Sequence, residues 1–283
     1  MTVGVAVKVF DGIVLAADSA TTLNLQDGSG NVVDHQVYNN AHKVFHLHRD
    51  LPIAGMTFGL GQIGNASIST LAKDLRQRLM GRDKSKGDWS VDSDTYKLES
   101  VAARVVEHMY EELYAPLHAS GPTPPVLGFV VAGYSSESDQ AEVWQITIEG
   151  TATPPVPVLI GSTTAYGWWA FAQPQPVGRL FNGIDDDLLT DILAMPGVDK
   201  ADVIAKAKAR QGNPALPPMP LADAIDLAHF MVDTTVGYRR FMPGTDTVGG
   251  PVDVASISRH EGFRWINRKY YYPTDLNPKD PHP

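Results

Sequence analysis

The second residue of the chain, Thr2, can carry two reactive groups at once. Its side chain has a hydroxyl group, and removal of Met1 would leave a free α-amino group on the same residue. An α-amine has an ordinary pKa of about 7.7 to 8.0, so near neutral pH part of it is unprotonated and can act as a base. Methionine aminopeptidase accepts a small residue such as threonine at the second position. We therefore expect Met1 to be removed and treat Thr2 as a candidate nucleophile.

The residues after Thr2 predict a hairpin that brings a carboxylate beside it. Two apolar runs, 3–9 and 13–17, flank Asp11-Gly12, a dipeptide typical of tight hairpin turns, and the second run ends at Asp18. Both ends of a hairpin lie on the same side of its turn, so Thr2 and Asp18 become neighbours. The N-terminus in this position could be buried for structural reasons only, or it could take part in catalysis; the hairpin is consistent with both.

The composition limits the classes of function. The 283 residues are 43% hydrophobic and 19% charged, which suits a globular chain with a sizeable core. A formal net charge of -9 argues against a partner that presents nucleic-acid phosphates. The chain has no cysteine, which excludes disulfides and thiolate catalysis. It has no secretory signal and no apolar run near the ~20 residues that span a bilayer, so we expect a cytoplasmic protein with no membrane partner.

The order of the expected elements indicates an α+β fold. Strands arrive in blocks separated by blocks of helices, which favours a four-layer αββα sandwich, with two antiparallel sheets between helical layers, over alternating βαβ units. We expect one domain over residues 1–283, with 267–283 as an extended tail. Residues 25–41 are expected to form a loop or a longer second hairpin. Further strands are expected at 43–48, 51–58, 126–134, 141–148, 156–160, 252–257 and 262–266; helices are expected to begin near 59–64 and 161–164 and to cover 98–113, 199–211 and 221–241.

Two patterns suggest bound ligands, and both have simpler explanations. Gly59-Leu-Gly61-Gln-Ile-Gly64 matches the dinucleotide fingerprint, but no strand ending in a ribose-binding acid follows about 20 residues later. We interpret it as a glycine-rich turn between a strand and a helix. His42, His46 and His48 have no third ligand at a recognisable spacing, so no metal and no cofactor are expected. The aromatic cluster at 166–171 is expected in the core or at an oligomer interface, and the charges of 185–208 on a solvated helical face.

The opening of the chain resembles the N-terminal nucleophile hydrolases of the proteasome β-subunit family. There the chain starts with threonine, passes through a hairpin similar to residues 11–18 (DGIVLAAD), and reaches a lysine at the head of a later strand, as Lys43 precedes Val-Phe here. Later, Gly161-Ser162 resembles the family's Gly-Ser turn that starts its third helix, and residues 246–253 resemble its Asp-x-x-Ser-Gly-Gly element. The long segment before Lys43 and the enlarged segment 174–220 are more similar to bacterial homologues of the Anbu kind.

The resemblance implies a role for each matching residue. Thr2 would be the nucleophile through its hydroxyl and the base through its amine, by way of a water molecule. Lys43 would hold positive charge beside Thr2, and Asp18 would pair with Lys43 and fix it.

Three further positions are implied around that centre. Ser162 and Asp246 would form hydrogen bonds near the terminus and orient it. The oxyanion donor would be a backbone N–H in the stretch 55–59, with Thr57 chosen by register. Gly249 stands where the family carries a supporting serine, and Ala20 where it commonly carries arginine.

The implied activity is that of a threonine-type peptidase acting through an acyl-enzyme ester. Its partners would be peptide or unfolded-protein substrates and further copies of the chain, in a ring or an open spiral; an ATPase partner stays open. Two alternatives remain: an amidohydrolase or transpeptidase of narrow specificity, and a catalytically silent scaffold subunit. The presence of Thr2, Asp18 and Lys43 favours an enzyme over the scaffold.

Overall fold

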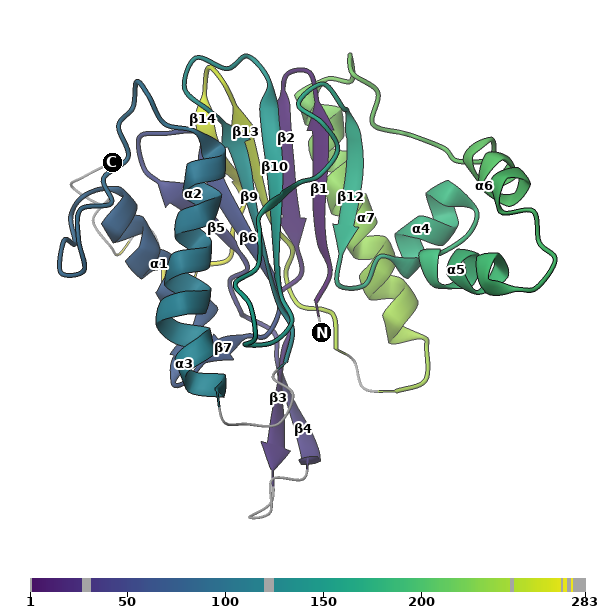
Figure 1. The fold of residues 1–283 in the computed structure, drawn as a ribbon, viewed down its shortest axis with the longest axis horizontal. Coiled ribbons are helices and arrows are strands. Elements are labelled where there is room, and N and C mark those ends of the chain that lie inside the picture. Colours follow the sequence, from purple (N-terminus) through teal and green to yellow (C-terminus); the bar gives the residue numbers. More distant parts are fainter. Residues whose placement is uncertain are drawn as a thin grey trace.

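Two five-stranded antiparallel sheets form the centre of the molecule, with helices on their outer faces (Figure 1). The computed structural model describes residues 2–26, 32–119, 125–244, 247–270, 272–273 and 276. The prediction of a mixed fold with antiparallel sheets is therefore confirmed.

The first sheet contains the predicted N-terminal hairpin. The register of the hairpin runs from Gly4 opposite Ala17 to Val9 opposite Gly12, so the start of the first strand and the end of the second lie side by side. The strand order in this sheet is β12 (Gly167–Phe171), β1 (Gly4–Val9), β2 (Gly12–Ala17), β13 (Asp253–Ser258) and β14 (Gly262–Asn267).

The second sheet carries the strands that face this hairpin. Its order is β11 (Val158–Leu159), β10 (Ala141–Ile148), β9 (Leu127–Tyr134), β6 (Ile53–Gly59) and β5 (Val44–His48). Two small sheets pair β3 (Thr21–Gln26) with β4 (Val32–Tyr38) and β7 (Gln62–Ile63) with β8 (Ala66–Ser67). Of the two possibilities for residues 25–41, the structure has the hairpin, which extends away from the large sheets (Figure 1).

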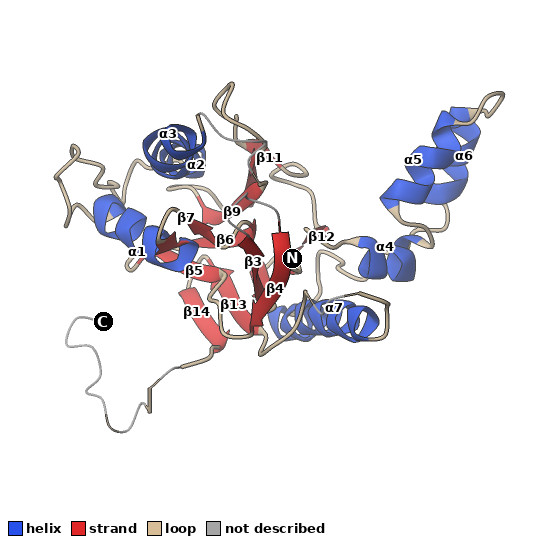
Figure 2. Cartoon of the chain, turned by 90° about the horizontal axis from the view of Figure 1, so that it is seen from below, coloured by secondary structure: helices blue, strands red, loops and turns tan. Residues whose placement is uncertain are grey.

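The helices divide between the two sheets. They are α1 (Ile68–Leu79), α2 (Leu98–Val105), the π-helical segment η1 (Val106–Tyr114), α3 (Ala115–His118), α4 (Gln175–Asn182), α5 (Asp186–Ala194), α6 (Lys200–Lys208) and α7 (Leu221–Arg240). The first two pack on the second sheet and α7 on the first. Seen from below, α4 to α6 lie beyond strand β12 (Figure 2).

Three apolar clusters bind these layers together. One joins α1, α2 and η1 to the second sheet through residues such as Leu75, Leu98 and Phe129. Another lies between the sheets and includes Leu15 and Met56. The remaining cluster joins the first sheet to α7. Burial of apolar area at these interfaces is the dominant favourable term in holding such layers together.

Two expected helix starts are wrong. The segment after Gly161-Ser162 is a turn that leads into strand β12. The side chains of this strand point alternately to its two faces, with Trp168 packed towards α7 and Trp169 towards the other sheet. Both faces are apolar, so the alternation of polarity that identifies a strand is missing. The other helix, α1, does not begin at 59–64 but at Ile68, where the Ser67 side chain accepts a hydrogen bond from the N–H of Thr70.

His46 provides a pH test of the packing between the sheets. Its ring stacks on Phe263 of the opposite sheet, with centroids 4.3 Å apart, and its Nε2 lies 3.3 Å from the Leu51 carbonyl oxygen. Burial lowers the pKa of His46 to about 4, from 6.5. The unfolded chain therefore takes up the proton first, so the free energy of unfolding should fall as the pH drops from about 6.5 to about 4.

Urea unfolding between pH 4 and pH 7 checks this expectation. His46→Phe keeps an aromatic ring but cannot titrate, so its stability should fall less over this range than that of the unsubstituted chain. His260→Phe, at an exposed position, is the matched control. Equal pH dependence in all three proteins would contradict the expectation.

Candidate functional site

The carboxylate of Asp18 is the centre of the candidate site. It is fully buried and accepts four hydrogen bonds. Oδ1 accepts from the backbone N–H of Val3 at 3.0 Å and from Lys43 Nζ at 2.6 Å. Oδ2 accepts from the N–H groups of Ala20 at 3.1 Å and Gly249 at 3.0 Å. A buried charge is tolerated when it is paired and hydrogen-bonded in this way.

Lys43 and Thr2 lie on the same side of this carboxylate. The ammonium and the N–H of Val3 share one oxygen, so the ammonium lies next to the peptide that joins Thr2 to Val3. Thr2 and Lys43 are both buried and both line a pocket of about 510 Å³. Burial lowers the pKa of Lys43, the Lys269 ammonium lowers it further, and Asp18 opposes the shift. The structure thus brings together the three residues at the centre of the sequence prediction.

The strand ends account for this placement. Asp18 follows the last residue of β2, and its N–H donates to the Val3 carbonyl at 3.2 Å, which continues the hairpin ladder by one pair. Lys43 precedes β5 in the other sheet, where its carbonyl accepts from the N–H of Thr57 at 2.9 Å. The two sheets therefore present these side chains to each other from adjoining ends.

Thr57 lines the pocket but cannot supply the predicted oxyanion donor. Its N–H is bonded to the Lys43 carbonyl, and its Oγ1 donates to the Gly128 carbonyl at 3.1 Å. N–H groups alternate between the two edges of a strand, so the N–H of Gly59 lies on the same edge of β6 as that of Thr57. It lies beyond the start of β5, which begins at Val44. Gly59 also lines the pocket. At its φ of 82° a Cβ would lie 2.3 Å from the Val126 carbonyl oxygen, so this position requires glycine.

Ser162 does not reach this site. Its carbonyl oxygen lies 3.3 Å from Lys8 Nζ, and β12 runs antiparallel to β1, with Gly167 opposite Lys8 and Phe171 opposite Gly4. The start of β12 is therefore at the end of β1 remote from Thr2, and the predicted contact is corrected. Asp246 lies outside the described residues.

The turn after β12 takes the place that Ser162 was expected to occupy. Phe171 pairs with Gly4, so residues 172–174 emerge at the Thr2 end of the sheet and lead into α4. Ala172 adopts a φ of 66°, and Gln173 is buried. A helix does begin at this end of the sheet, but from a different turn than the Gly-Ser pattern indicated.

A second buried lysine–aspartate pair lies beside the first. Lys269 Nζ pairs with Asp253 and donates to Ser19 Oγ at 2.6 Å, while His42 Nδ1 is 3.6 Å from Asp253 Oδ2. The N–H of Ser19 donates to the Gly249 carbonyl at 2.9 Å. Burial lowers the pKa of Lys269, and Asp253 opposes that shift. This pair braces the segment that carries Asp18. Sequence reasoning missed it because Lys269 stands in the expected tail, far along the chain.

Two other expectations concern ligands and membranes. Within the described ranges, no group of three or more histidine, cysteine or acidic residues is arranged to hold a metal ion. Of the helices in the described part of the chain, none combines the length and apolar composition that a bilayer crossing requires.

Comparison with known proteins adds a likeness of fold. No family model matches this sequence, and no curated protein matches it. The structure is similar to that of an Anbu (Gly-1) mutant from Hyphomicrobium sp. strain MC1, with 14% sequence identity, 95% of this chain and 86% of that chain covered, and a TM-score of 0.49. Anbu is also the kind of homologue to which the long segment before Lys43 and the enlarged segment 174–220 are similar. This likeness concerns the fold, and the chemistry of the site is indicated by the contacts of its own residues.

Replacing Lys269 tests the second pair. Lys269→Met leaves the buried carboxylate of Asp253 without its ammonium, which should lower the free energy of unfolding by about 3 to 5 kcal/mol. The double variant Lys269→Met/Asp253→Asn removes the stranded charge and should recover part of that loss. Urea unfolding measures both.

The control is an exposed pair of the same type. Lys206 Nζ lies 2.7 Å from Asp202 on α6, with side chains 73% and 51% exposed. Lys206→Met should cost less than about 1 kcal/mol. If Lys269→Met costs no more than this control, the second pair does not brace the site.

Proposed function

We propose that this chain is a threonine-type N-terminal nucleophile hydrolase that cleaves peptide bonds. The observation that carries the proposal is that Thr2 and Lys43 line one pocket, while the Lys43 ammonium is bonded to the buried carboxylate of Asp18. The Anbu likeness supports a proteasome-like fold, and the order of helices and sheets is compatible with the four-layer αββα sandwich of such hydrolases. The cytoplasmic location and the homo-oligomeric ring or spiral remain predictions of the same proposal.

The reaction would begin when Met1 is removed and the α-amine of Thr2 becomes free. The unprotonated amine takes the proton of the Thr2 hydroxyl through a water molecule, and the oxygen attacks the carbonyl carbon of the substrate. The tetrahedral intermediate collapses as the amide nitrogen receives the proton and leaves as an amine. A water molecule then hydrolyses the Thr2 ester and releases the acid.

The surrounding groups have defined parts in this proposal. The ammonium of Lys43 stabilises the developing negative charge on the Thr2 oxygen and disfavours protonation of the nearby α-amine. Asp18 holds that ammonium in place. The N–H of Gly59 is our candidate for the donor to the oxyanion, since it lies at the edge of the same pocket.

Mass spectrometry and covalent labelling test the nucleophile. We expect purified protein to lack Met1 and to be modified once by an electrophile directed at N-terminal threonine, such as an epoxyketone. Thr2→Ala should abolish the labelling, because the hydroxyl is lost, while Thr57→Ala should retain it. Retention of Met1 on nearly all chains would overturn the proposal. Labelling without hydrolysis of any peptide in a varied set would favour an amidohydrolase of narrow specificity.

Replacing Lys43 should shift the pH profile of labelling. Loss of the ammonium raises the pKa of the α-amine of Thr2, so the rate should need a higher pH to reach its plateau. The plateau itself should fall by about 10² to 10³, the range for removing one stabilising donor. Lys43→Met is the variant that shows this shift; Lys43→Met/Asp18→Asn removes both charges and should show a smaller one. Lys73→Met, which removes another ammonium from the pocket lining, should change neither quantity.

A further inference from the structure

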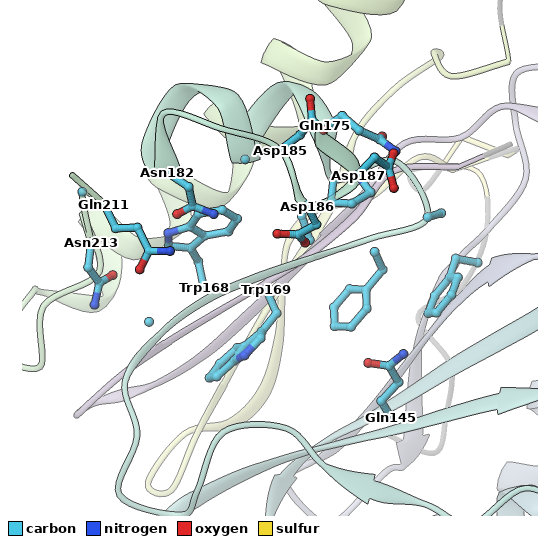
Figure 3. Close-up of a pocket in the computed structure, with 18 of the residues that line it drawn as sticks. Gln145, Trp168, Trp169, Gln175, Asn182, Asp185, Asp186, Asp187, Gln211 and Asn213 are labelled. Atoms are coloured by element: carbon cyan, nitrogen blue, oxygen red, sulfur yellow. The ribbon is translucent and has the colours of Figure 1, made fainter. Parts of the chain in front are cut away.

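A second cavity, of about 580 Å³, lies on the other side of Phe58 from the candidate site. It is open to solvent and lies between strand β12 and the segment that contains α4 and α5; Figure 3 shows the side chains that line it. Phe58 lines both cavities, and its ring stacks on Phe171 with centroids 5.4 Å apart. None of the residues proposed for catalysis lines this second cavity.

Strand β12 presents an open edge to this cavity. It is the last strand of its sheet, and no described strand pairs with its outer side. The N–H of Asp18 donates to the carbonyl of Val3, so the odd-numbered residues of β1 bond to β2 and the even-numbered ones to β12. The partners of the even-numbered residues are Gly167, Trp169 and Phe171. The backbone groups of Trp168 and Ala170 therefore point away from the sheet.

Both of these residues line the cavity, so their N–H and C=O groups are available to an extended chain. A strand edge of this kind is a template for strand addition, in which backbone hydrogen bonds supply affinity. A cavity formed along such an edge fits a peptide better than a compact small molecule.

The wall opposite the strand is acidic. Asp185, Asp186 and Asp187 line the cavity at the start of α5, and no lysine, arginine or histidine is among its described lining residues. Asp185 is paired with Arg179 and caps the helix through the N–H of Leu188. Asp187 accepts from Gln175 Nε2 at 3.2 Å, which leaves its charge unbalanced. All three carboxylates stabilise the positive end of the helix dipole at the start of α5. That role does not require them to face the cavity.

The rest of the lining suits side chains that end in a cation and carry an apolar stem. Trp168 and Trp169 provide aromatic rings, and such rings attract ammonium and guanidinium groups. Amide side chains complete the wall: Gln145, Gln175, Asn182, Gln211 and Asn213 (Figure 3). These can accept hydrogen bonds from lysine and arginine.

We propose that this cavity binds an extended peptide segment with basic side chains, added as a strand to the outer edge of β12 between Trp168 and the carboxylates of α5. The inference rests on the proposed function insofar as it makes this segment part of the substrate. Phe171, at the end of β12, pairs with Gly4, so a chain that follows this edge runs towards Thr2. The substrate class is then a peptide with lysine or arginine at a distance from the bond that is cut.

A binding experiment on the Thr2→Ala full-length chain separates this inference from catalysis. The probe is a fluorescein-labelled peptide of alternating lysine and valine, and its analogue with glutamate for lysine is the comparison. We expect fluorescence anisotropy to show binding of the lysine peptide, at least tenfold tighter than the glutamate peptide, with an affinity that falls as salt is added.

Two variants with matched controls address the edge and the charge. Ala170→Pro removes an N–H that points away from the sheet, a position where strands tolerate proline, and should weaken binding about five- to tenfold, as for one lost hydrogen bond. Ala170→Ser keeps the N–H and should bind normally. Asp186→Asn/Asp187→Asn should weaken binding about three- to tenfold, whereas Asp202→Asn, outside the cavity lining, should not.

Several outcomes would overturn the inference. Equal binding of the two peptides would contradict a preference for basic side chains. Normal binding by Ala170→Pro would contradict binding at the edge of β12. If neither peptide binds and Ala170→Pro changes the oligomeric state in sedimentation, the occupant of the edge is a second copy of the chain. Labelling of Thr2 in the unsubstituted chain, without peptide binding by the Thr2→Ala chain, would contradict this inference alone. Binding without any labelling of Thr2 would instead sink the proposed function.

Discussion

The buried carboxylate of Asp18 is the interaction on which the candidate site depends. Its two oxygens join the start of the described chain, Ala20 in the segment after β2, the head of β5 and the loop before β13 through four donors. Removing Lys43 would leave an unpaired carboxylate in the interior, and removing a backbone donor would leave one of its oxygens less fully hydrogen-bonded, so each loss is costly. The position of Thr2 is therefore determined by electrostatics inside the fold rather than by contacts at the surface.

The local part of this arrangement could be predicted from the sequence. The Asp11-Gly12 turn between two apolar runs determines the hairpin and its register, so the neighbourhood of Thr2 and Asp18 follows from short-range rules. Lys43 required the family resemblance, because nothing in its spacing points to Asp18. Its placement comes from the packing of one sheet on the other, which no local pattern encodes.

The remaining residues show where such reasoning ends. Strand β12 is apolar on both faces, so its periodicity could not be told from that of a buried helix. The position of Ser162 was predicted from the Gly-Ser pattern alone, and the register of β12 puts it at the other end of the sheet. The N–H of Thr57 is bonded to Lys43, and the next N–H on that strand edge, of Gly59, lies beyond the start of β5, a difference that depends on where β5 begins. The role of Lys269 depends on a contact with Ser19, 250 residues away in sequence.

That contact has a consequence for the order in which the candidate site is completed during synthesis. Thr2 leaves the ribosome long before Lys269, so the proposed removal of Met1 can take place while the residues between them are still being made. Ser19 gains its lysine partner only when residue 269 has emerged and β14 has joined β13. A contact of such long range forms late, because a large loop must close before it is gained. A nascent chain thus carries the proposed nucleophile without its complete surroundings until residue 269 has emerged.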